Sequence, residues 1–174
     1  MNNKQTPPHK QKDFVDDLIA EWLIPFPTLD VSAIPVVARI VRMSHHISQL
    51  VDANFARYNL TVGEFEVLAA LTRHPQEQMT PKQLGKNILI SSGGLTNRIN
   101  RLEEKALIVR LPDPTDRRGV IIQVTPKGKA LAMEAVVTHM IVENTLIDGL
   151  DPTEKEQLAA LLKKLLLTQK KELN

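Results

Sequence analysis

One β-rich hairpin constrains the fold of this chain most strongly, because the sequence on both sides of it predicts helices. The runs "LIVRL" and "VIIQV" are rich in β-branched residues, and the turn between them contains Pro112, Pro114 and Gly119. The same turn carries Arg117 and Arg118, which have no role in a core. The sequence therefore predicts a mainly α chain with a two-stranded β-hairpin that presents two arginines to solvent.

Helix start signals precede the hairpin. The segment "TVGE" from Thr61 predicts a capping box, and "TPKQ" from Thr80 adds proline at the first helical position of a short helix. Ser91 or Ser92 is expected to cap the next helix. That helix carries one apolar stripe, formed by Leu95, Ile99, Leu102 and Ala106.

The order of these elements predicts a winged helix-turn-helix over residues 61–125. In this arrangement the second helix presents its first turns to base edges in the major groove, while the hairpin reaches the backbone or the adjacent minor groove. We expect Asp116 to pair with a wing arginine and hold it in position. The candidate DNA-binding residues are Lys82, Gln83, Ser91, Ser92, Thr96, Asn97, Arg98, Arg101, Asp116, Arg117 and Arg118.

The distribution of charge agrees with a polyanion site. Between Ser91 and Lys129 there are eight Lys and Arg residues against four acids, a surplus of four positive charges in a chain whose formal net charge is +2. A basic segment on a mildly acidic body is typical of a nucleic-acid contact, although a solvated charged face gives the same count.

The regions that flank the winged helix are also predicted to be helical. Residues 1–12 are expected to form a flexible tail, and 13–35 a short extra helix followed by a proline-rich linker. A long helix is expected from Val36 to Tyr58, closed by Asn59. "TPKG" starts another long helix, and "DPTE" caps a last one with an apolar stripe formed by Leu158, Leu161, Leu162, Leu165 and Leu166.

Several classes of function are disfavoured by what the sequence lacks. Without cysteine there are no disulfides, thiolate catalysis, Cys-based zinc sites or thiol redox sensing. His45 and His46 are adjacent and therefore point in different directions on a helix, so we assign them no metal. We expect no cofactor and no enzyme activity, because no catalytic motif is found. The polar N-terminus and the lack of a long apolar run predict a cytoplasmic protein without a membrane anchor.

Three segments together resemble the MarR family of winged-helix repressors: "NLTVGEFEVLAAL", "SSGGLTNRINRLEEKALIVR" and "DPTDRRGVIIQVTPKGKAL". The family's wing pattern, Asp-x-Arg, falls on Asp116 and Arg118, and Val124 stands where the family usually has leucine. The resemblance covers roughly residues 36–170. It implies a homodimer joined through terminal helices, here 36–60 and 126–174 with the leucine stripe, bound to a pseudo-palindromic duplex.

A narrower resemblance, to the PecS/HucR branch of urate-responsive regulators, implies a small-molecule site. It rests on the extra N-terminal helix, "PTLDVSAIPVVARI" and "SSGGLTNR". The branch's tryptophan and two arginines fall on Trp22, Arg73 and Arg98, while its aspartate position is occupied by Glu66. An aromatic face, guanidinium donors and a carboxylate acceptor suit a planar anionic heterocycle such as urate.

The sequence leaves other interpretations open. Each residue of the proposed ligand site is also compatible with an ordinary core or surface role. The effector can be another phenolic or aromatic compound, since Glu66 departs from the branch. The chain can also be a ligand-independent DNA-architectural protein, or a helical dimerisation module whose wing contacts protein.

Overall fold

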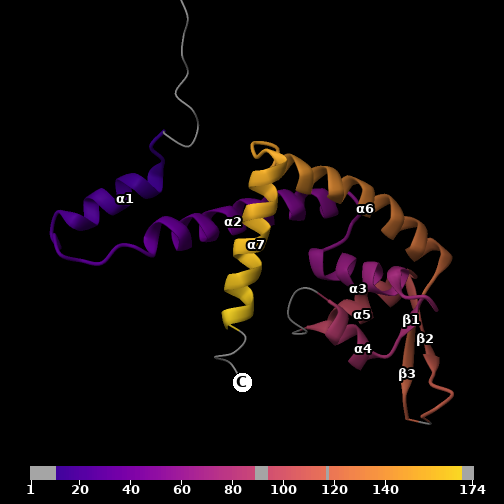
Figure 1. Cartoon of the computed structure of the whole chain (residues 1–174). Helices are drawn as coiled ribbons and strands as arrows, with labels where there is room; N and C mark the ends of the chain where they lie inside the picture. Colours follow the sequence, from indigo (N-terminus) through magenta and orange to yellow (C-terminus); the bar gives the residue numbers. More distant parts are fainter. Residues whose placement is uncertain (1–10, 89–93, 117, 170–174) are drawn as a thin grey trace, which may run out of the picture. The chain divides into compact units, whose positions relative to one another are not determined.

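The computed structural model describes residues 11–88, 94–116 and 118–169, and Figure 1 shows the order of its helices and strands. The chain divides into two compact units, residues 1–49 and 50–174, and each is described by itself. Within the described ranges, no helix combines the length and apolarity that crossing a bilayer requires.

The N-terminal unit contains α1 (Phe14–Leu23) and most of α2 (Ile34–Ala56). Asp13 caps α1 in a capping box, and its carboxylate also accepts a hydrogen bond from Arg39 of α2 at 2.9 Å. In α1, Val15 is buried, while Trp22 is 46% exposed. Charge pairing therefore contributes to holding α1 against α2.

The second unit is built around α3 (Val62–Arg73) and α4 (Pro81–Asn87), followed by α5 (Leu95–Glu104). The strands β2 (Ile108–Pro112) and β3 (Val120–Val124) form the predicted hairpin. A third strand that the sequence analysis missed, β1 (Gln78–Met79), pairs antiparallel with β3, so the sheet order is β1-β3-β2.

The helix caps show how local sequence sets the boundaries. Thr61 and Thr80 each cap a helix through the predicted capping box, and Thr125 accepts a hydrogen bond from the amide of Gly128 at the start of α6 (Pro126–Leu146). Asn59 adopts the predicted left-handed conformation, with a φ of 54°. These predictions are confirmed.

The cap of α5 differs from the prediction. Ser91 and Ser92 lie outside the described residues, and the N-cap is Gly94, in the left-handed conformation with a φ of 76°. Glycine has no Cβ and adopts this conformation without steric cost. The predicted stripe is confirmed for Ile99 and Leu102, which are buried, whereas Ala106 lies beyond the helix and is exposed.

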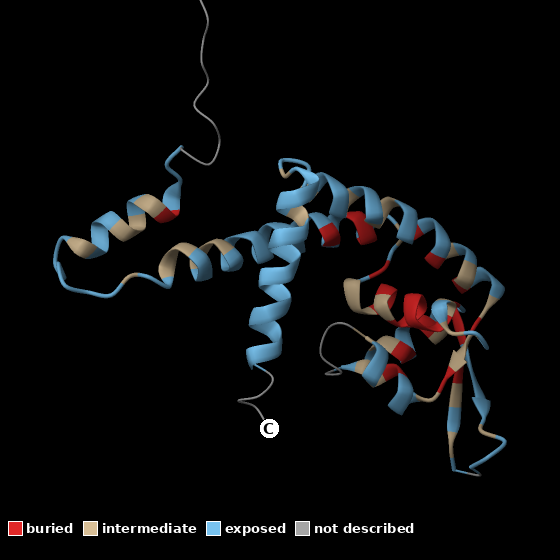
Figure 2. Cartoon of the chain, in the orientation of Figure 1, coloured by how far each residue is buried: buried red, intermediate tan, exposed pale blue. Residues whose placement is uncertain are grey.

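Most of the core residues belong to the winged-helix body, residues 61–125, and its immediate neighbours. Figure 2 shows the buried residues concentrated in α3 and the elements around it. The rings of Phe55 and Phe65 stack with centroids 4.1 Å apart. Gly128 sits so close to the hairpin that a Cβ there would lie 2.9 Å from the carbonyl carbon of Leu107. This close approach joins the start of α6 to the body.

The last helix, α7 (Pro152–Gln169), begins at the predicted cap: Asp151 and Glu154 exchange hydrogen bonds of 2.9 Å. No residue of α7 is buried within the protomer, and the helix is exposed along its length in Figure 2. The exposed side chains include the whole predicted stripe, Leu158, Leu161, Leu162, Leu165 and Leu166.

Candidate nucleic-acid interface

Helix α5 carries a polar exposed side and an apolar buried side. Ile99 and Leu102 pack into the core, and the opposite side of the helix exposes polar and charged residues at helical spacing. These exposed residues are Thr96, Asn97, Asn100, Arg101 and Glu104. The predicted residues Thr96, Asn97 and Arg101 thus face solvent together, while Arg98 is half-buried.

Helix α4 precedes α5 and exposes both of its predicted DNA-binding residues, Lys82 and Gln83. The side-chain oxygen of Gln83 accepts a hydrogen bond of 2.8 Å from the backbone amide of Thr80. Because the capping box occupies this oxygen, Gln83 offers chiefly its NH₂ group to a partner. Lys82 extends from the first turn of α4 as a point charge suited to a phosphate.

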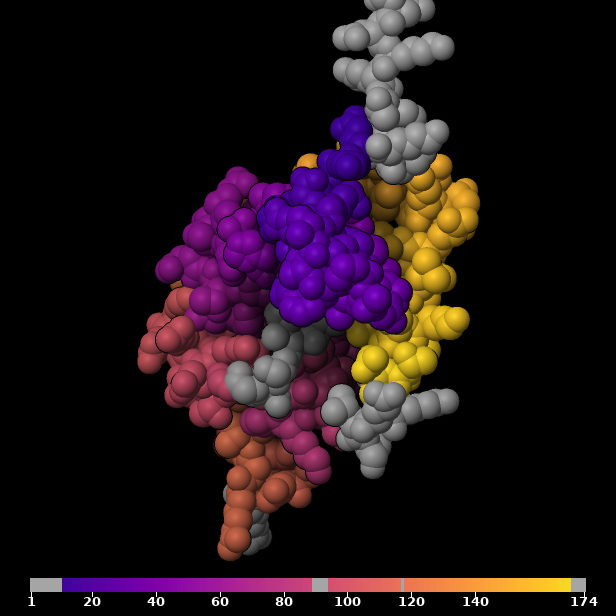
Figure 3. All heavy atoms as spheres, turned by 90° about the vertical axis from the view of Figure 1, so that its left-hand side faces the viewer, coloured from indigo at the N-terminus to yellow at the C-terminus, as the bar shows by residue number. Residues whose placement is uncertain are grey.

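The hairpin β2–β3 projects beyond the helices of its unit, as its lower position in Figures 1 and 3 shows. Its turn is held by side chains. The carboxylate of Asp113 accepts hydrogen bonds from the hydroxyl of Thr115 at 2.7 Å and its amide at 2.8 Å, and these bonds lower the pKa of Asp113. The amide of Gly119 donates to the carbonyl of Asp116 at 2.8 Å, which closes the turn.

Asp116 positions the predicted wing arginine through the backbone. Its carboxylate accepts a hydrogen bond of 2.9 Å from the backbone amide of Arg118, whose side chain is exposed. Arg117 lies outside the described residues. The sequence predicted that Asp116 pairs with a wing arginine and holds it in position, and the described contact fixes the backbone from which the Arg118 side chain extends.

A buried ion pair joins the end of α5 to the start of α3. Lys105 donates hydrogen bonds to the carboxylate of Glu64 at 2.9 Å and to the carbonyl of Asn59 at 2.7 Å. Glu64 is 1% exposed, and it also accepts a hydrogen bond of 2.8 Å from the amide of Thr61. The capping-box glutamate of α3 therefore also anchors the end of α5.

Arg98 packs against α3 at Gly63, a residue without a side chain. A Cβ at Gly63 would lie 2.6 Å from the guanidinium carbon of Arg98, so the guanidinium occupies that space. Gly63 lies three residues before Glu66, on the same side of α3. Arg98 thus reaches from α5 to the side of α3 that carries Glu66.

A third contact between distant elements was not predicted. Arg110 of β2 forms an ion pair with Glu103 and donates a hydrogen bond of 2.5 Å to the amide oxygen of Asn100. Both partners belong to α5 and lie one turn apart. The hairpin is therefore connected to α5 through one guanidinium group.

Comparison with known proteins identifies the relatives of this arrangement. The profile of the MarR family matches residues 58–119. Over 149 residues, 85% of this chain and 90% of the relative, the sequence is 34% identical to the HTH-type transcriptional regulator PecS of Dickeya dadantii. The chain belongs to the MarR family.

Two solved structures of similar fold extend the comparison. A mutant of Escherichia coli MarR in complex with operator DNA has a TM-score of 0.68 at 28% identity, covering 79% of this chain and 99% of that one. Bordetella bronchiseptica BpsR, whose DNA binding is regulated by 6-hydroxynicotinic acid, has a TM-score of 0.68 at 27% identity, with 75% and 91% covered. The MarR family assignment confirms the winged-helix fold, and the similarity to PecS supports the resemblance to the PecS-like branch.

The four ligand residues predicted for this MarR-family chain are divided between the two units. Glu66 is half-buried on α3, and Arg73 is exposed at the end of the same helix, two turns further along the same side. The guanidinium of Arg98 reaches this side of α3 at Gly63. Trp22 belongs to the N-terminal unit, so a site shared by all four residues stays a prediction.

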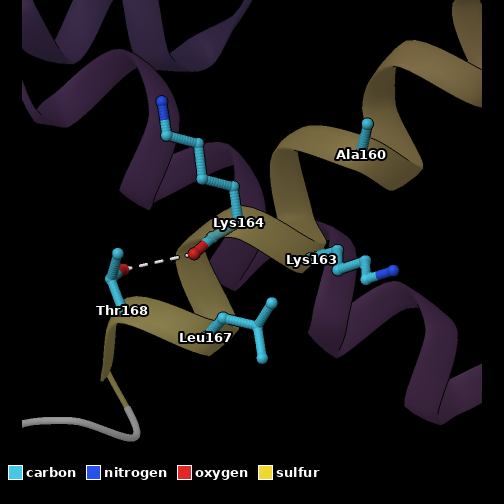
Figure 4. Close-up of a pocket in the computed structure, with 5 residues that line it drawn as sticks. All are labelled: Ala160, Lys163, Lys164, Leu167 and Thr168. Atoms are coloured by element: carbon cyan, nitrogen blue, oxygen red, sulfur yellow. Dashed lines mark hydrogen bonds between the residues drawn. The ribbon is translucent and has the colours of Figure 1, made fainter.

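A hollow of about 360 Å³ lies along α7 and contains none of these four residues. It is lined by Ala160, Lys163, Lys164, Leu167 and Thr168, all from one helix. Figure 4 shows these side chains, with the hydroxyl of Thr168 donating to the carbonyl of Lys164 at 3.3 Å. A depression bounded by a single helix belongs to the exposed face of α7 and does not enclose a small ligand.

Proposed function

We propose that this MarR-family protein is a homodimeric repressor that binds a pseudo-palindromic operator and is released by a small anionic aromatic ligand such as urate. The observation that carries the DNA-binding part is the exposed polar side of α5 beside a projecting hairpin that carries Arg118. In such proteins the recognition helix reads base edges, while a basic hairpin contacts the backbone or minor groove.

The dimer is supported by the exposed apolar faces of the terminal helices. In α7 the stripe that includes Leu162 and Leu165 is exposed, and none of its residues is buried among the described residues. A second copy provides such a cover by symmetry, because the same face on both protomers is complementary to itself. A dimer also accounts for a two-fold operator, since each protomer reads one half-site about 34–36 Å from the other.

Release by a ligand is supported by the position of Arg98. This residue extends from the recognition helix to the side of α3 that carries Glu66. An anion bound by Arg73 and Arg98 would bind the same Arg98 guanidinium that packs α5 against α3. Its binding would thereby change the position of α5 on DNA. The two binding events are thermodynamically linked: the factor by which the ligand lowers the affinity for DNA equals the factor by which DNA lowers the affinity for the ligand.

Two alternatives remain distinct from this proposal. The first is another phenolic or aromatic effector, because Glu66 departs from the branch's aspartate, and the regulation of BpsR by an aromatic acid supports that class of compound. A DNA-architectural protein without a ligand would cover duplex DNA independently of sequence. Footprinting separates it from a repressor, which protects a short palindrome.

The experiment that tests the ligand is a titration of urate, with 6-hydroxynicotinate in parallel, into the protein bound to its operator. Trp22 is the only tryptophan, so its fluorescence has one source. We expect quenching and DNA release at the same concentrations, and strong attenuation of both in Arg73→Ala. Arg57→Ala, at an exposed arginine outside the predicted site, is the matched control. Undiminished quenching in Arg73→Ala would contradict the proposed site.

A further inference from the structure

Asn100 lies near the middle of the exposed side of α5. Thr96 precedes it by one turn and Glu104 follows by one turn, and all three residues are exposed. Ile99 and Leu102 occupy the opposite, buried side. If α5 enters the major groove, Asn100 therefore faces the base edges more directly than residues at the flank of the helix do.

Glu103 marks one flank of this exposed side. It is half-buried, and the guanidinium of Arg110 lies between it and Asn100, because Arg110 contacts both residues. The chain reverses just after α5: Ala106 has a φ of 56°, and the amide of Leu107 donates to the carbonyl of Leu102 at 2.9 Å. This reversal brings β2 back along the helix and places Arg110 at its flank.

The chemistry of arginine fixes which atom of Asn100 faces it. A guanidinium has five N–H donors and no acceptor, so its partner in the amide group must be the oxygen. The ion pair with Glu103 holds Arg110 in place, and the hydrogen bond to the Asn100 oxygen is 2.5 Å long. The oxygen of Asn100 is thus turned to the flank of the helix.

An amide carries its oxygen and its NH₂ group on opposite sides of one planar carbon. With the oxygen engaged by Arg110, the NH₂ group is the part of the exposed Asn100 amide that is left to a partner. An asparagine that turns freely presents both groups and pairs bidentately with the N6 and N7 atoms of adenine. An asparagine whose orientation is fixed in this way presents only its NH₂ donor. Guanine N7 and O6 and thymine O4 accept from it, whereas adenine places its own N6 donor beside its N7 acceptor and is therefore disfavoured.

We propose that Asn100 is a specificity-determining residue of the recognition helix and that Arg110 sets its specificity by fixing the amide with the NH₂ group outward. The inference rests on the proposed function, since it requires α5 to read duplex DNA. It assigns Arg110 a positioning role, because Arg110 acts through Asn100 without contacting a base.

The test is selection of bound duplexes from a library randomised over about 20 base pairs, the span of two half-sites. For the wild-type protein we expect guanine or thymine at one position of each half-site. In Arg110→Ala the amide is free to turn, and the preference there should move to adenine. In Asn100→Asp the donor is replaced by an acceptor, so the preference should move to the amino groups of cytosine or adenine. We expect each change to alter the base ratio at that position on the order of tenfold.

Asn87→Asp is the matched control, because it adds the same charge at an exposed asparagine of α4 that is not among the candidate DNA-binding residues. It should leave the preference at the Asn100 position unchanged. Unaltered base preferences in Arg110→Ala, with uniformly weaker binding, would overturn the inference and leave the proposed function intact. If Arg110→Ala does not fold by circular dichroism, Asn100→Asp decides alone, and an unaltered preference overturns the inference. A wild-type protein that enriches no sequence would overturn the proposed function, and the inference with it.

Discussion

In the winged-helix body the large apolar side chains of α3 are buried within one protomer, whereas those of α7 are exposed. Phe65, Leu68 and Leu71 are at most 6% exposed, while Leu161 and Leu166 are 60% and 68% exposed. Both helices have apolar residues at helical spacing, so the sequence pattern of α7 alone does not reveal which kind of surface covers it. The winged-helix body therefore buries its apolar residues within one protomer, whereas the apolar stripe of α7 stays exposed among the described residues.

The two regions also use charge differently. In the body, Lys105 neutralises the buried carboxylate of Glu64, so an ion pair fixes the position of α5. In α7, Lys163 and Lys164 lie exposed on the helix beside the leucine stripe. Buried charge requires a partner, whereas exposed charge is solvated. In the body a buried charge thus helps to fix the packing of two helices, whereas the charges of α7 contact solvent.

The largest effect is expected from Leu162→Asp combined with Leu165→Asp, which tests whether the face of α7 is a dimer interface. In the proposed dimer these carboxylates would be buried without partners, at a cost of several kcal/mol. The dimer and operator binding should be lost, while the body remains folded because neither leucine belongs to its core. Sedimentation at micromolar concentration and circular dichroism measure the two outcomes.

Ala160→Asp combined with Lys163→Asp is the control for this prediction, because helical spacing places both residues on the other side of α7 from Leu162 and Leu165. This variant should remain dimeric. A persistent dimer in the leucine variant would mean that the interface lies elsewhere.

The second prediction tests the closed packing of the body with Gly128→Ala. The added Cβ would lie 2.9 Å from the carbonyl carbon of Leu107 and 3.0 Å from a methyl group of Val124, so the backbone of the hairpin would have to move. We expect a loss of about 2–3 kcal/mol in the free energy of unfolding. Urea unfolding at one fixed protein concentration measures this loss.

Gly149→Ala is the matched control, since a Cβ at this exposed glycine would meet no atom within 4 Å among the described residues. Its effect should stay within about 0.5 kcal/mol. Equal effects of the two substitutions would contradict the close packing of α6 on the hairpin.

Most predictions that depended on local sequence were confirmed, but the cap of α5 was not, because its N-cap is Gly94 and the predicted Ser91 and Ser92 lie outside the described residues. Thr61, Thr80 and Thr125 each cap a helix, because a cap forms between residues three positions apart and needs no tertiary contact. The hairpin was equally visible from its β-branched runs. Strand β1 was missed because it has two residues and pairs with a strand far along the chain, at Gln123 and Ile122.

Within the candidate site, the sequence predicted only the features that follow from helical spacing along α5. Thr96, Asn97 and Arg101 share the exposed side of α5 as the spacing indicated. The contacts of Arg110 with Asn100 and of Lys105 with Glu64 depend on the tight reversal after α5 and on the packing of α5 against α3. Neither contact has a local pattern that a single sequence reveals.

The third prediction concerns Arg118→Ala, which removes a charge from the wing without touching either apolar surface. If Arg118 neutralises one phosphate, operator affinity should fall in the variant, and the slope of log K against log salt concentration should become shallower by about 0.9. The dimer should persist, because the side chain is exposed at the tip of the hairpin. Fluorescence anisotropy of labelled operator at several salt concentrations measures both quantities, with Arg57→Ala as control. An unchanged affinity and slope would remove Arg118 from the interface.

The smallest effect is expected in the N-terminal unit, where α1 is held by charge more than by burial. Arg39 donates hydrogen bonds of 2.9 Å to both carboxylate oxygens of Asp13 and to Asp16. The hydrogen bonds from Arg39 are the main reason that the pKa of Asp13 falls to about 2 from the ordinary 3.8. A carboxylate whose pKa is lower in the folded state stabilises that state above its ordinary pKa, and this contribution is lost as the pH falls through the folded value.

The ion pair should therefore be intact at neutral pH and weaken only as the pH falls from about 4 to about 2. Trp22 lies on α1 and provides the readout, since its emission should change when α1 separates from α2.

In Asp13→Asn the titrating group is absent, so the part of the emission change that belongs to this ion pair should disappear, while acid unfolding of the rest remains. The difference between the two titrations isolates the Asp13 contribution. Because the pair is exposed and screened by solvent, we expect a shift of the Trp22 transition and no loss of the fold at neutral pH. Coincident titration curves for wild type and Asp13→Asn would show that this ion pair does not hold α1. The helix would then be held by its few buried apolar contacts, and in this respect it would resemble the winged-helix body.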